Sequence, residues 1–247
     1  MLLKLALRNI FRQRIRSVVT LVAIVFGVTG LILSGGFVKD IFVQLGEAII
    51  QSETGHVQVF RVGFREQGTR RPDRYLIEDP APHAARIKTS LLVREVSSRL
   101  SFSGLINNGR SDLPIVGEGI EPDKEAQLGS FLKMVSGRPL TDSDGFGVIV
   151  GEGLATSLAL HVGDQVTLLV NTAGGALNTV DLEVVGIFQS FSRDFDARAL
   201  RIPLAAAQEL LATAGANQLV VTLHHTRDTD DALVAIQAQL AGSGLEA

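Results

Sequence analysis

Residues 8–40 read RNIFRQRIRSVVTLVAIVFGVTGLILSGGFVKD, and this stretch decides how the rest of the chain is interpreted. Its central part, 17–38, contains no charged side chain, and as an α-helix it would be about 33 Å long. The hydrocarbon core of a bilayer is about 30 Å thick. The apolar core of a signal peptide is shorter, about 7–15 residues, and a buried helix of a soluble protein rarely goes so far without a charge. We therefore predict a transmembrane helix over 17–38.

The charges beside this run predict its orientation in the membrane. Residues 1–16 contain no acidic side chain, and their basic residues are Lys4, Arg8, Arg12, Arg14 and Arg16. Residues 39–58 contain one lysine and three acidic side chains. Because basic residues are retained on the cytoplasmic side, the N-terminus is expected to be cytoplasmic and the bulk of the chain extracytoplasmic.

The first sixteen residues have a helical pattern of their own. Leu3, Leu7 and Ile10 fall on one helical face, while Lys4 and Arg8 lie off it. This pattern predicts a short helix in the cytoplasmic membrane interface, with the basic residues of 1–16 among the lipid headgroups. A disordered basic tail is the alternative.

Small residues mark one face of the predicted transmembrane helix. Gly30 and Ser34 are four residues apart, and Gly27 lies one turn before them. Since small side chains let helix backbones approach closely in lipid, we expect Gly27, Gly30 and Ser34 to pack against another helix. The alternative is that glycine is simply frequent in membrane helices. Apolar residues then recur at helical spacing, which predicts a helical extension outside the membrane over 39–54, with the helix ending near Gln51.

Composition limits the partners of the exterior part. Residues 17–247 hold all 26 acidic side chains but only 18 of the 23 basic ones, a formal charge of −8 (18 − 26). Such a surface is a poor partner for nucleic acid. The chain has no Cys, which excludes disulfides and thiolate-bound metals. An exterior part of about two hundred residues is long enough to bury a core in one or two domains.

The exterior part reads as an α+β domain. Apolar patterns predict strands at 56–60, 93–103, 113–120, 147–151, 165–171, 179–188, 198–204 and 218–223. Helices are predicted at 80–92, 152–160, 204–213 and 228–240, the last three followed by Gly163, Gly215 and Gly242. The polar segment 61–75 is expected to be a loop, and TAGGAL (172–177) a turn.

Six segments, taken in order, resemble one known family. They are LALRNIFRQRIRSVVTLVAIVFGVTGLIL (5–33), GHVQV (55–59), PIVGEGIEPDKE (114–125), GVIVGEGLATSLALHVGDQVTLL (147–169), DLEVVGIF (181–188) and IPLAAAQELL (202–211). Together they are similar to the first half of MacB/FtsX-type ABC transporter permeases, a group that includes the lipoprotein-releasing permeases. The resemblance implies one transmembrane helix followed by an extracytoplasmic domain. That domain would have an α/β part (55–110 and 200–247) and an inserted β-rich part (111–199).

The resemblance also implies a function. In the family, ATP hydrolysis by a partner ATPase moves membrane helices and exterior domains, and the movement exports a substrate or releases lipoproteins from the membrane. Three further membrane helices follow the exterior domain. This chain ends at GSGLEA, where the family continues into a last exterior strand and those helices, and it has no phosphate-binding loop of its own. It is therefore expected to be the N-terminal half of a permease.

The implied partners follow from that role. They are an ABC ATPase, a second permease subunit in a homodimer or heterodimer, membrane lipid, and a periplasmic carrier or adaptor. The short loop NTAGGALNT (171–179) lies where lipoprotein-releasing permeases have a longer hairpin that recruits a carrier, so this last role is less expected here. The implied location is the bacterial inner membrane, with a periplasmic main domain.

The sequence leaves two other classes of function open. The chain could be a single-pass anchored adaptor or sensor that binds a partner and transports nothing. An enzyme has less support, because no Gly-x-Ser-x-Gly motif is present. GEGLAT (151–156) also lacks the third glycine of a phosphate loop. No catalytic residue and no cofactor are expected.

Two groups of side chains invite a metal interpretation. His224 and His225 are adjacent in a strand, so their side chains point to opposite faces, and ordinary strand-end residues are the expectation. The aspartates stand in two pairs, Asp142 and Asp144, then Asp194 and Asp196. Neither pair belongs to a full loop of oxygen ligands, and the first is expected to cap a turn before GFGVIV (145–150). No metal site is expected.

Overall fold

The structure is a computed structural model that describes residues 14–50, 54–68, 75–126, 132–172, 174–190 and 192–247. The chain divides into two units, and the boundary lies between Glu47 and Ala48.

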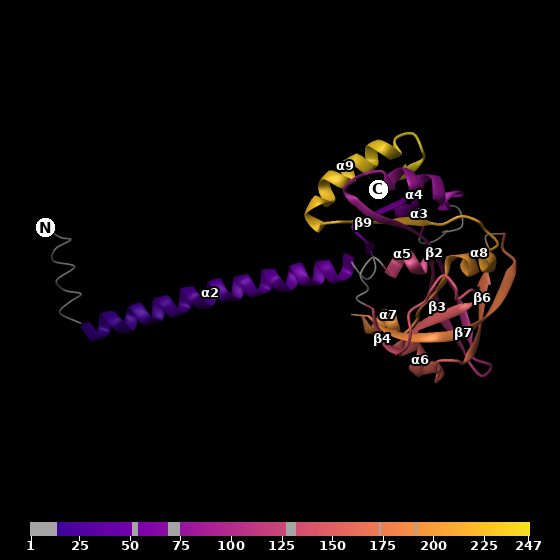
Figure 1. The fold of residues 1–247 in the computed structure, drawn as a ribbon. Helices are drawn as coiled ribbons and strands as arrows, with labels where there is room; N and C mark the ends of the chain where they lie inside the picture. Colours follow the sequence, from indigo (N-terminus) through magenta and orange to yellow (C-terminus); the bar gives the residue numbers. More distant parts are fainter. Residues whose placement is uncertain (1–13, 51–53, 69–74, 127–131, 173, 191) are drawn as a thin grey trace. The chain divides into compact units, whose positions relative to one another are not determined.

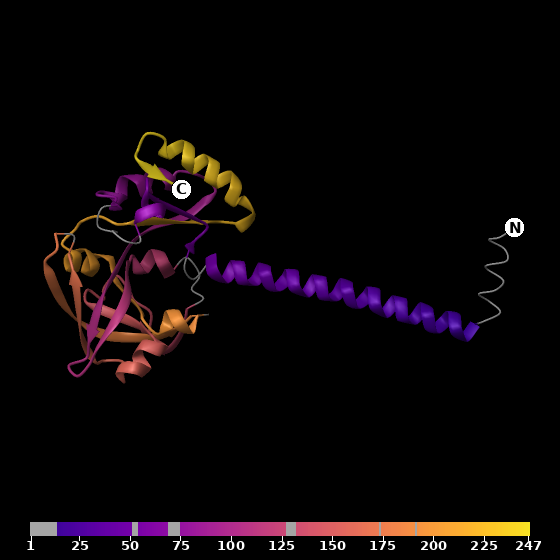
Figure 2. The same ribbon diagram turned by 180° about the vertical axis from the view of Figure 1, so that it is seen from behind.

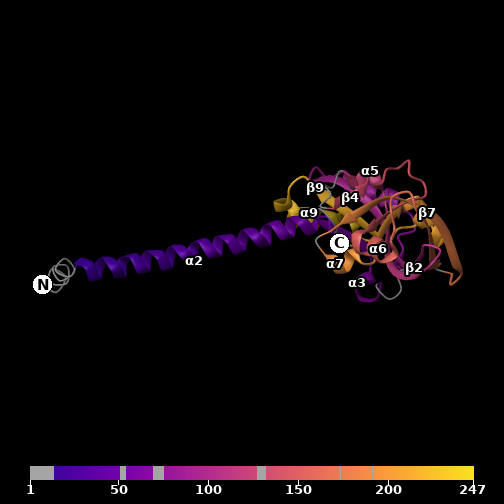
Figure 3. The same ribbon diagram turned by 90° about the horizontal axis from the view of Figure 1, so that it is seen from below.

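The described part of the first unit is the helix α2, which covers Arg14–Ile49 without a break and whose last two residues lie past the boundary (Figure 3). It is long and apolar enough to cross a membrane: its apolar window has a mean hydropathy of 2.4, and none of that window is buried. A core helix of a soluble protein would be mostly covered. The helix continues through 39–49 as the sequence predicts, whereas its expected end near Gln51 lies outside the described residues.

The second unit contains a closed barrel of six strands. They are β2 (Val93–Asn107), β3 (Asp112–Ile120), β5 (Gly147–Gly151), β6 (Gln165–Asn171), β7 (Leu177–Gln189) and β8 (Ala199–Pro203). Around the ring the order is β2, β3, β8, β5, β7 and β6. The ring closes because β6 returns to β2 over the pairs from Gly104↔Val170 to Asn107↔Thr167. Two neighbour pairs, β3–β8 and β5–β7, are parallel, and the other four are antiparallel.

Apolar side chains fill this barrel. Alternate residues of a barrel strand face inward, and in β6 those are the buried Val166, Leu168 and Val170. Two helices add to the same core: α6 (Glu152–Leu158) follows β5, and α8 (Leu204–Leu211) follows β8. Because β5 and β8 are antiparallel neighbours, the two helices cover opposite ends of the barrel (Figure 1).

Beside the barrel lies an open antiparallel sheet with the order β10, β1, β9 and β2. Its strands β1 (Val57–Arg61), β9 (Gln218–Leu223) and β10 (Leu245–Glu246) pair with one another and with the first part of β2. Two helices, α4 (Pro80–Lys88) and α9 (Thr229–Leu240), pack against this sheet and share its core. Figure 2 shows them together on this part of the molecule.

Strand β2 belongs to both sheets. Its residues 93–99 pair with β9, and its residues 100–107 pair with β3. The core clusters place β8 and α8 with the barrel. We therefore keep the division into an α/β part and a β-rich part as a proposal. For the α/β part, the packing favours 54–99 plus 212–247, where the sequence suggested 55–110 plus 200–247. For the β-rich part, it favours 100–211, where the sequence suggested 111–199.

Helix ends differ from the sequence prediction. Helix α4 ends at Lys88 and not near 92, because β2 already begins at Val93. Helices α6 and α8 end at left-handed alanines, Ala159 (φ 50°) and Ala212 (φ 53°), and not at the following glycines. An alanine accepts this strained conformation here because its N–H still caps carbonyls of the last turn.

Several short elements were not predicted. Helix α3 (Phe64–Gln67) lies in the segment expected to be a loop, where Phe64 stacks on Phe60 with ring centroids 4.7 Å apart. The others are α5 (Pro122–Glu125), α7 (Arg193–Asp196), the 3-10 helix η4 (Thr226–Asp228) and the strand β4 (Lys133–Gly137), which pairs with β7. Strand β10 was also unexpected: Leu245 and Glu246 pair with Arg61 and Phe60 at the edge of the open sheet.

Candidate functional site

The residues expected at the membrane surface are only partly described. Arg14 and Arg16 lie in the first turn of α2. Lys4, Arg8 and Arg12 lie outside the described residues. Of the interfacial helix predicted over 1–16, only residues 14–16 are described. Their role at lipid headgroups stays a prediction.

The small residues expected to pack against another helix lie on α2. Gly27, Gly30 and Ser34 are exposed, and a Cβ added at Gly27 or Gly30 would meet no described atom within 4 Å. The described part of the chain therefore supplies no neighbour for this face, and its packing role also stays a prediction.

The histidine and glycine motifs have ordinary surroundings. His224 and His225 are exposed just after β9. No group of three or more His, Cys, Asp or Glu side chains that could hold a metal occurs among the described residues. In GEGLAT, Gly153 lies against the backbone of Ala197, so this glycine permits close packing between α6 and α7.

In the first aspartate pair, Asp144 caps a turn, whereas Asp142 accepts a bond from the Asp123 N–H at 3.3 Å. The Asp144 carboxylate accepts hydrogen bonds from the Thr141 N–H (2.7 Å) and hydroxyl (2.9 Å), and two more from the Arg138 guanidinium (2.6 Å each). These contacts, the bond from Arg138 first, hold the pKa of Asp144 well below its usual range. In the second pair, Asp196 is buried and accepts from the Ser190 N–H at 3.0 Å.

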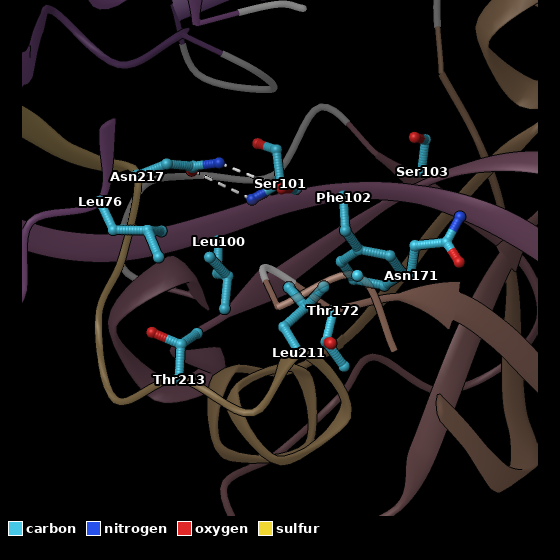
Figure 4. A pocket seen from close by; sticks show the side chains of 11 residues that line it. Leu76, Leu100, Ser101, Phe102, Ser103, Asn171, Thr172, Leu211, Thr213 and Asn217 are labelled. Atoms are coloured by element: carbon cyan, nitrogen blue, oxygen red, sulfur yellow. Dashed lines mark hydrogen bonds between the residues drawn. The ribbon is translucent and has the colours of Figure 1, made fainter. Parts of the chain in front are cut away.

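A groove of about 290 Å³ lies where the open sheet meets the barrel, and we call it the junction groove (Figure 4). Its lining comes from β2, from the ends of β6 and α8, and from the segments before α4 and β9. The lining residues are Leu76, Leu100, Ser101, Phe102, Ser103, Asn171, Thr172, Gly175, Leu211, Thr213 and Asn217.

The groove exists because β2 changes partner on one edge. Pairing with β9 ends at Arg99↔Gln218, and pairing with β6 begins at Gly104↔Val170, so residues 100–103 lie between the two ladders. The Asn217 amide occupies part of this gap. It accepts from the Ser101 N–H and donates to the Ser101 carbonyl, both at 3.0 Å, as a neighbouring strand would (Figure 4).

The β6–β7 hairpin forms one rim of the groove. Its turn is closed by the Thr172 N–H, which donates to the Ala176 carbonyl at 2.8 Å. Just beyond the turn, the Asn178 amide donates to the Leu210 carbonyl at 2.9 Å and ties the hairpin to α8. The hairpin is thus fastened to the helix α8.

The chemistry of the groove suits the binding of a partner. Its lining combines apolar side chains, such as Leu100 and Phe102, with hydroxyl and amide groups, and none of the lining residues is titratable. General acid–base catalysis needs a group that exchanges a proton. A neutral, partly apolar partner, bound by hydrogen bonds and burial of apolar surface, is what such a lining suits.

Sequence reasoning missed this groove. Its lining residues are neutral, common types from several separate segments, and they form no motif. The groove arises from the change in pairing along β2, which only the tertiary structure shows.

Comparison with known proteins gives a consistent result. A family described as the MacB-like periplasmic core domain matches residues 17–239. The lipoprotein-releasing system transmembrane protein LolE of Haemophilus influenzae is 28% identical over 133 residues, which cover 51% of this chain and 32% of LolE. This chain therefore matches about a third of that relative's length.

Two solved structures share the fold. The periplasmic region of MacB from Actinobacillus actinomycetemcomitans superposes with a TM-score of 0.53 at 16% identity, covering 76% of this chain and 85% of that one. The extracellular domain of the noncanonical ABC-type transporter YknZ from Gram-positive bacteria gives a TM-score of 0.55 at 15% identity, covering 77% and 97%. The predicted α+β fold, with one N-terminal apolar helix before a mixed domain, is confirmed.

Proposed function

Because this chain belongs to the family of MacB-like periplasmic core domains, we propose that it is the N-terminal, largely extracytoplasmic half of an ABC transporter permease subunit. One observation carries this proposal. The family match runs over 17–239 and so includes both the apolar helix and the exterior domain. An ABC-permease role is what the family supports; the ATPase coupling, the substrate and the further membrane helices are proposed here.

In this proposal the partner ATPase supplies the work, and the chain supplies the moving exterior part. Helix α2 ends at Ile49 and β1 begins at Val57, so a short connection joins the membrane helix to the open sheet. Movement of the membrane helices would pass through this connection to the exterior domain. The outcome would be export of a substrate, or release of a lipoprotein from the bacterial inner membrane.

The proposed partners have separate places on the chain. Lipid headgroups would contact Arg14 and Arg16 with the other basic residues of 1–16 on the cytoplasmic side. The remaining membrane helices, or a second permease subunit, would pack on Gly27, Gly30 and Ser34. The junction groove, neutral and partly apolar, is the proposed contact for a periplasmic carrier, an adaptor or the cargo itself.

Purification from native membranes tests the function. The tagged chain, solubilised in mild detergent, should bring with it an ATPase that carries a Gly-x-x-x-x-Gly-Lys-Ser/Thr loop, and the complex should hydrolyse ATP. Recovery of the intact chain without any ATPase, under conditions that preserve a known ABC complex from the same membranes, would favour the single-pass adaptor or sensor.

The small-residue face gives a sharper test within the helix. Gly30→Leu should reduce recovery of the other permease helices, because a larger side chain pushes two packed helix backbones apart. Gly36→Leu is the matched control, since residue 36 lies on the side of α2 opposite Gly27 and Ser34 at 100° per residue. Equal recovery with both variants would remove the packing role of this face.

Photo-crosslinking tests the groove. A photoreactive residue at Thr213, in the lining, should crosslink to a periplasmic partner or cargo during ATP turnover. The same probe at Val234, which is 68% exposed on α9 and outside the groove, is the control. Equal crosslinking at both positions would show that the groove has no special role.

A further inference from the structure

A buried ionic cluster lies at the crossing between the open sheet and the barrel. It contains two arginines and two glutamates: Arg99, Glu118, Glu125 and Arg201. Arg99 is 1% exposed and is the largest fully buried side chain among the described residues. Burying charges costs several kcal/mol per ion unless each charge is paired and hydrogen-bonded, so a cluster of this kind needs an explanation.

The central pair joins the two parts of the domain. Arg99 is the last residue of β2 that pairs with β9 in the open sheet. Glu125 ends α5, which directly continues the barrel strand β3. The Arg99 guanidinium donates two bonds to the Glu125 carboxylate, Nε to Oε1 and Nη2 to Oε2, both 2.7 Å. Such a paired fork fixes direction as well as distance.

Further contacts surround this pair. The Ser97 hydroxyl donates to Glu125 at 3.0 Å, and the Ser98 N–H donates to the Glu121 carboxylate at 2.7 Å. Within the barrel, Arg201 on β8 donates from Nε to Glu118 on β3 at 3.0 Å. Burial alone would raise the pKa of Glu125, but the charge of Arg99, the hydrogen bonds and the charge of Arg201 lower it overall. The carboxylate is thus held ionised in a buried place.

The cluster is one of several connections between the open sheet and the barrel, and it differs from the others in being both ionic and directional. The crossing is also made by the strand β2, by the chain between α8 and β9, and by the Asn217 amide on Ser101. Leu76 adds an apolar contact with the barrel core. A continuous strand can bend or twist, and apolar contacts tolerate sliding because they have no preferred direction. A two-bonded ion pair resists such movement, because a small rotation leaves two buried charges unpaired.

We propose that the Arg99–Glu125 pair, supported by Arg201 and Glu118, is a lock that fixes the angle between the open sheet and the barrel. Its role is orientation more than stability. Replacing both partners of a buried pair by apolar residues of similar size is often neutral for stability. The double replacement should therefore leave the chain folded and release the angle. This proposal does not depend on the identity of the transported substrate.

The test measures distances in the full chain in lipid nanodiscs. The chain has no Cys, so two introduced cysteines can be spin-labelled without background. Val162→Cys lies beside the barrel after α6, and Val234→Cys lies on α9 of the open-sheet part; both positions are exposed. In the Arg99→Met/Glu125→Leu variant, the distance distribution between these labels should broaden or shift its maximum relative to the parent.

The control pair lies within one part. Leu91→Cys and Val234→Cys both belong to the open-sheet part, and their distribution should stay unchanged in the same variant. If the double variant does not fold, Arg99→Lys, which keeps the buried charge paired but cannot form the two-bonded fork, gives the same reading. An unchanged Val162–Val234 distribution in a folded variant would overturn the lock, as would equal broadening in the control pair.

Discussion

The helix α2 and the barrel are built from the same apolar residue types in opposite environments. Leu31 of α2 is 76% exposed, and Leu182 of β7 is fully buried. In the barrel, protein atoms replace water around each apolar side chain. Around α2 the described chain supplies no such cover, and a continuous apolar surface of this kind needs another apolar solvent. The difference shows that the exposure of a side chain, and not its type, identifies the part of the chain that belongs in lipid.

Truncation of one leucine in each region should separate the two environments most strongly. Leu182→Ala leaves a cavity in a packed core and should lower the free energy of unfolding by about 2–5 kcal/mol. Leu31→Ala should leave it nearly unchanged, because lipid fills the space. Chemical denaturation of the α+β domain, followed in the nanodisc-bound chain, measures both free energies. Similar losses for the two variants would mean that α2 is packed in a protein core.

The contrast between these regions was visible in the sequence, but the closure of the barrel was not. Period-two patterns gave β6 its correct bounds, and the charge-free run located α2. Closure requires β6 to pair with Asn107 and its neighbours, about sixty residues earlier, and no local pattern encodes such a partner. Strand β4 was missed because it is short and mostly exposed, with no alternation to detect.

The candidate site was less accessible to sequence reasoning than the fold. No sequence pattern singled out Arg99 and Glu125, because the sequence does not show that β2 and α5 cross. The groove depends on a gap between two ladders on one strand. Residues such as Ser101 and Asn217 acquire their roles only when that gap is formed. Patterns read along the chain predict elements, whereas these sites arise from contacts between distant elements.

A charge placed in each region should produce the next largest effect. Val25→Arg puts a charge in the middle of the apolar run, where insertion becomes less favourable by about 3 kcal/mol. The variant should shift from the membrane to the soluble or aggregated fraction. Val234→Arg, on the exposed face of α9, should stay in the membrane fraction like the parent. Unchanged membrane association of Val25→Arg would contradict a lipid environment for α2.

The smallest expected effect concerns an ion pair on the barrel side. Since the pKa of Asp144 is depressed in the folded chain, its pair with Arg138 contributes stability above the unfolded pKa of about 3.9, and this contribution is lost as pH falls through the folded pKa. Asp144→Asn should therefore lower Tm slightly at neutral pH, with a difference from the parent that shrinks below about pH 4. If the Tm difference between Asp144→Asn and the parent grew on acidification, the ion pair would not be its cause. Asp142→Asn, at the other aspartate of the same turn, is the control.

The central claim is that α2 crosses the membrane and places the domain outside, and reporter fusions test it most directly. Alkaline phosphatase folds only in the oxidising exterior compartment, and green fluorescent protein exported through the same route in unfolded form stays dark. Joined after Ala247 in a Gram-negative host, the phosphatase should be active and the fluorescent protein dark. An inactive phosphatase together with a bright fluorescent protein, both at normal expression, would place the domain in the cytoplasm and contradict the account.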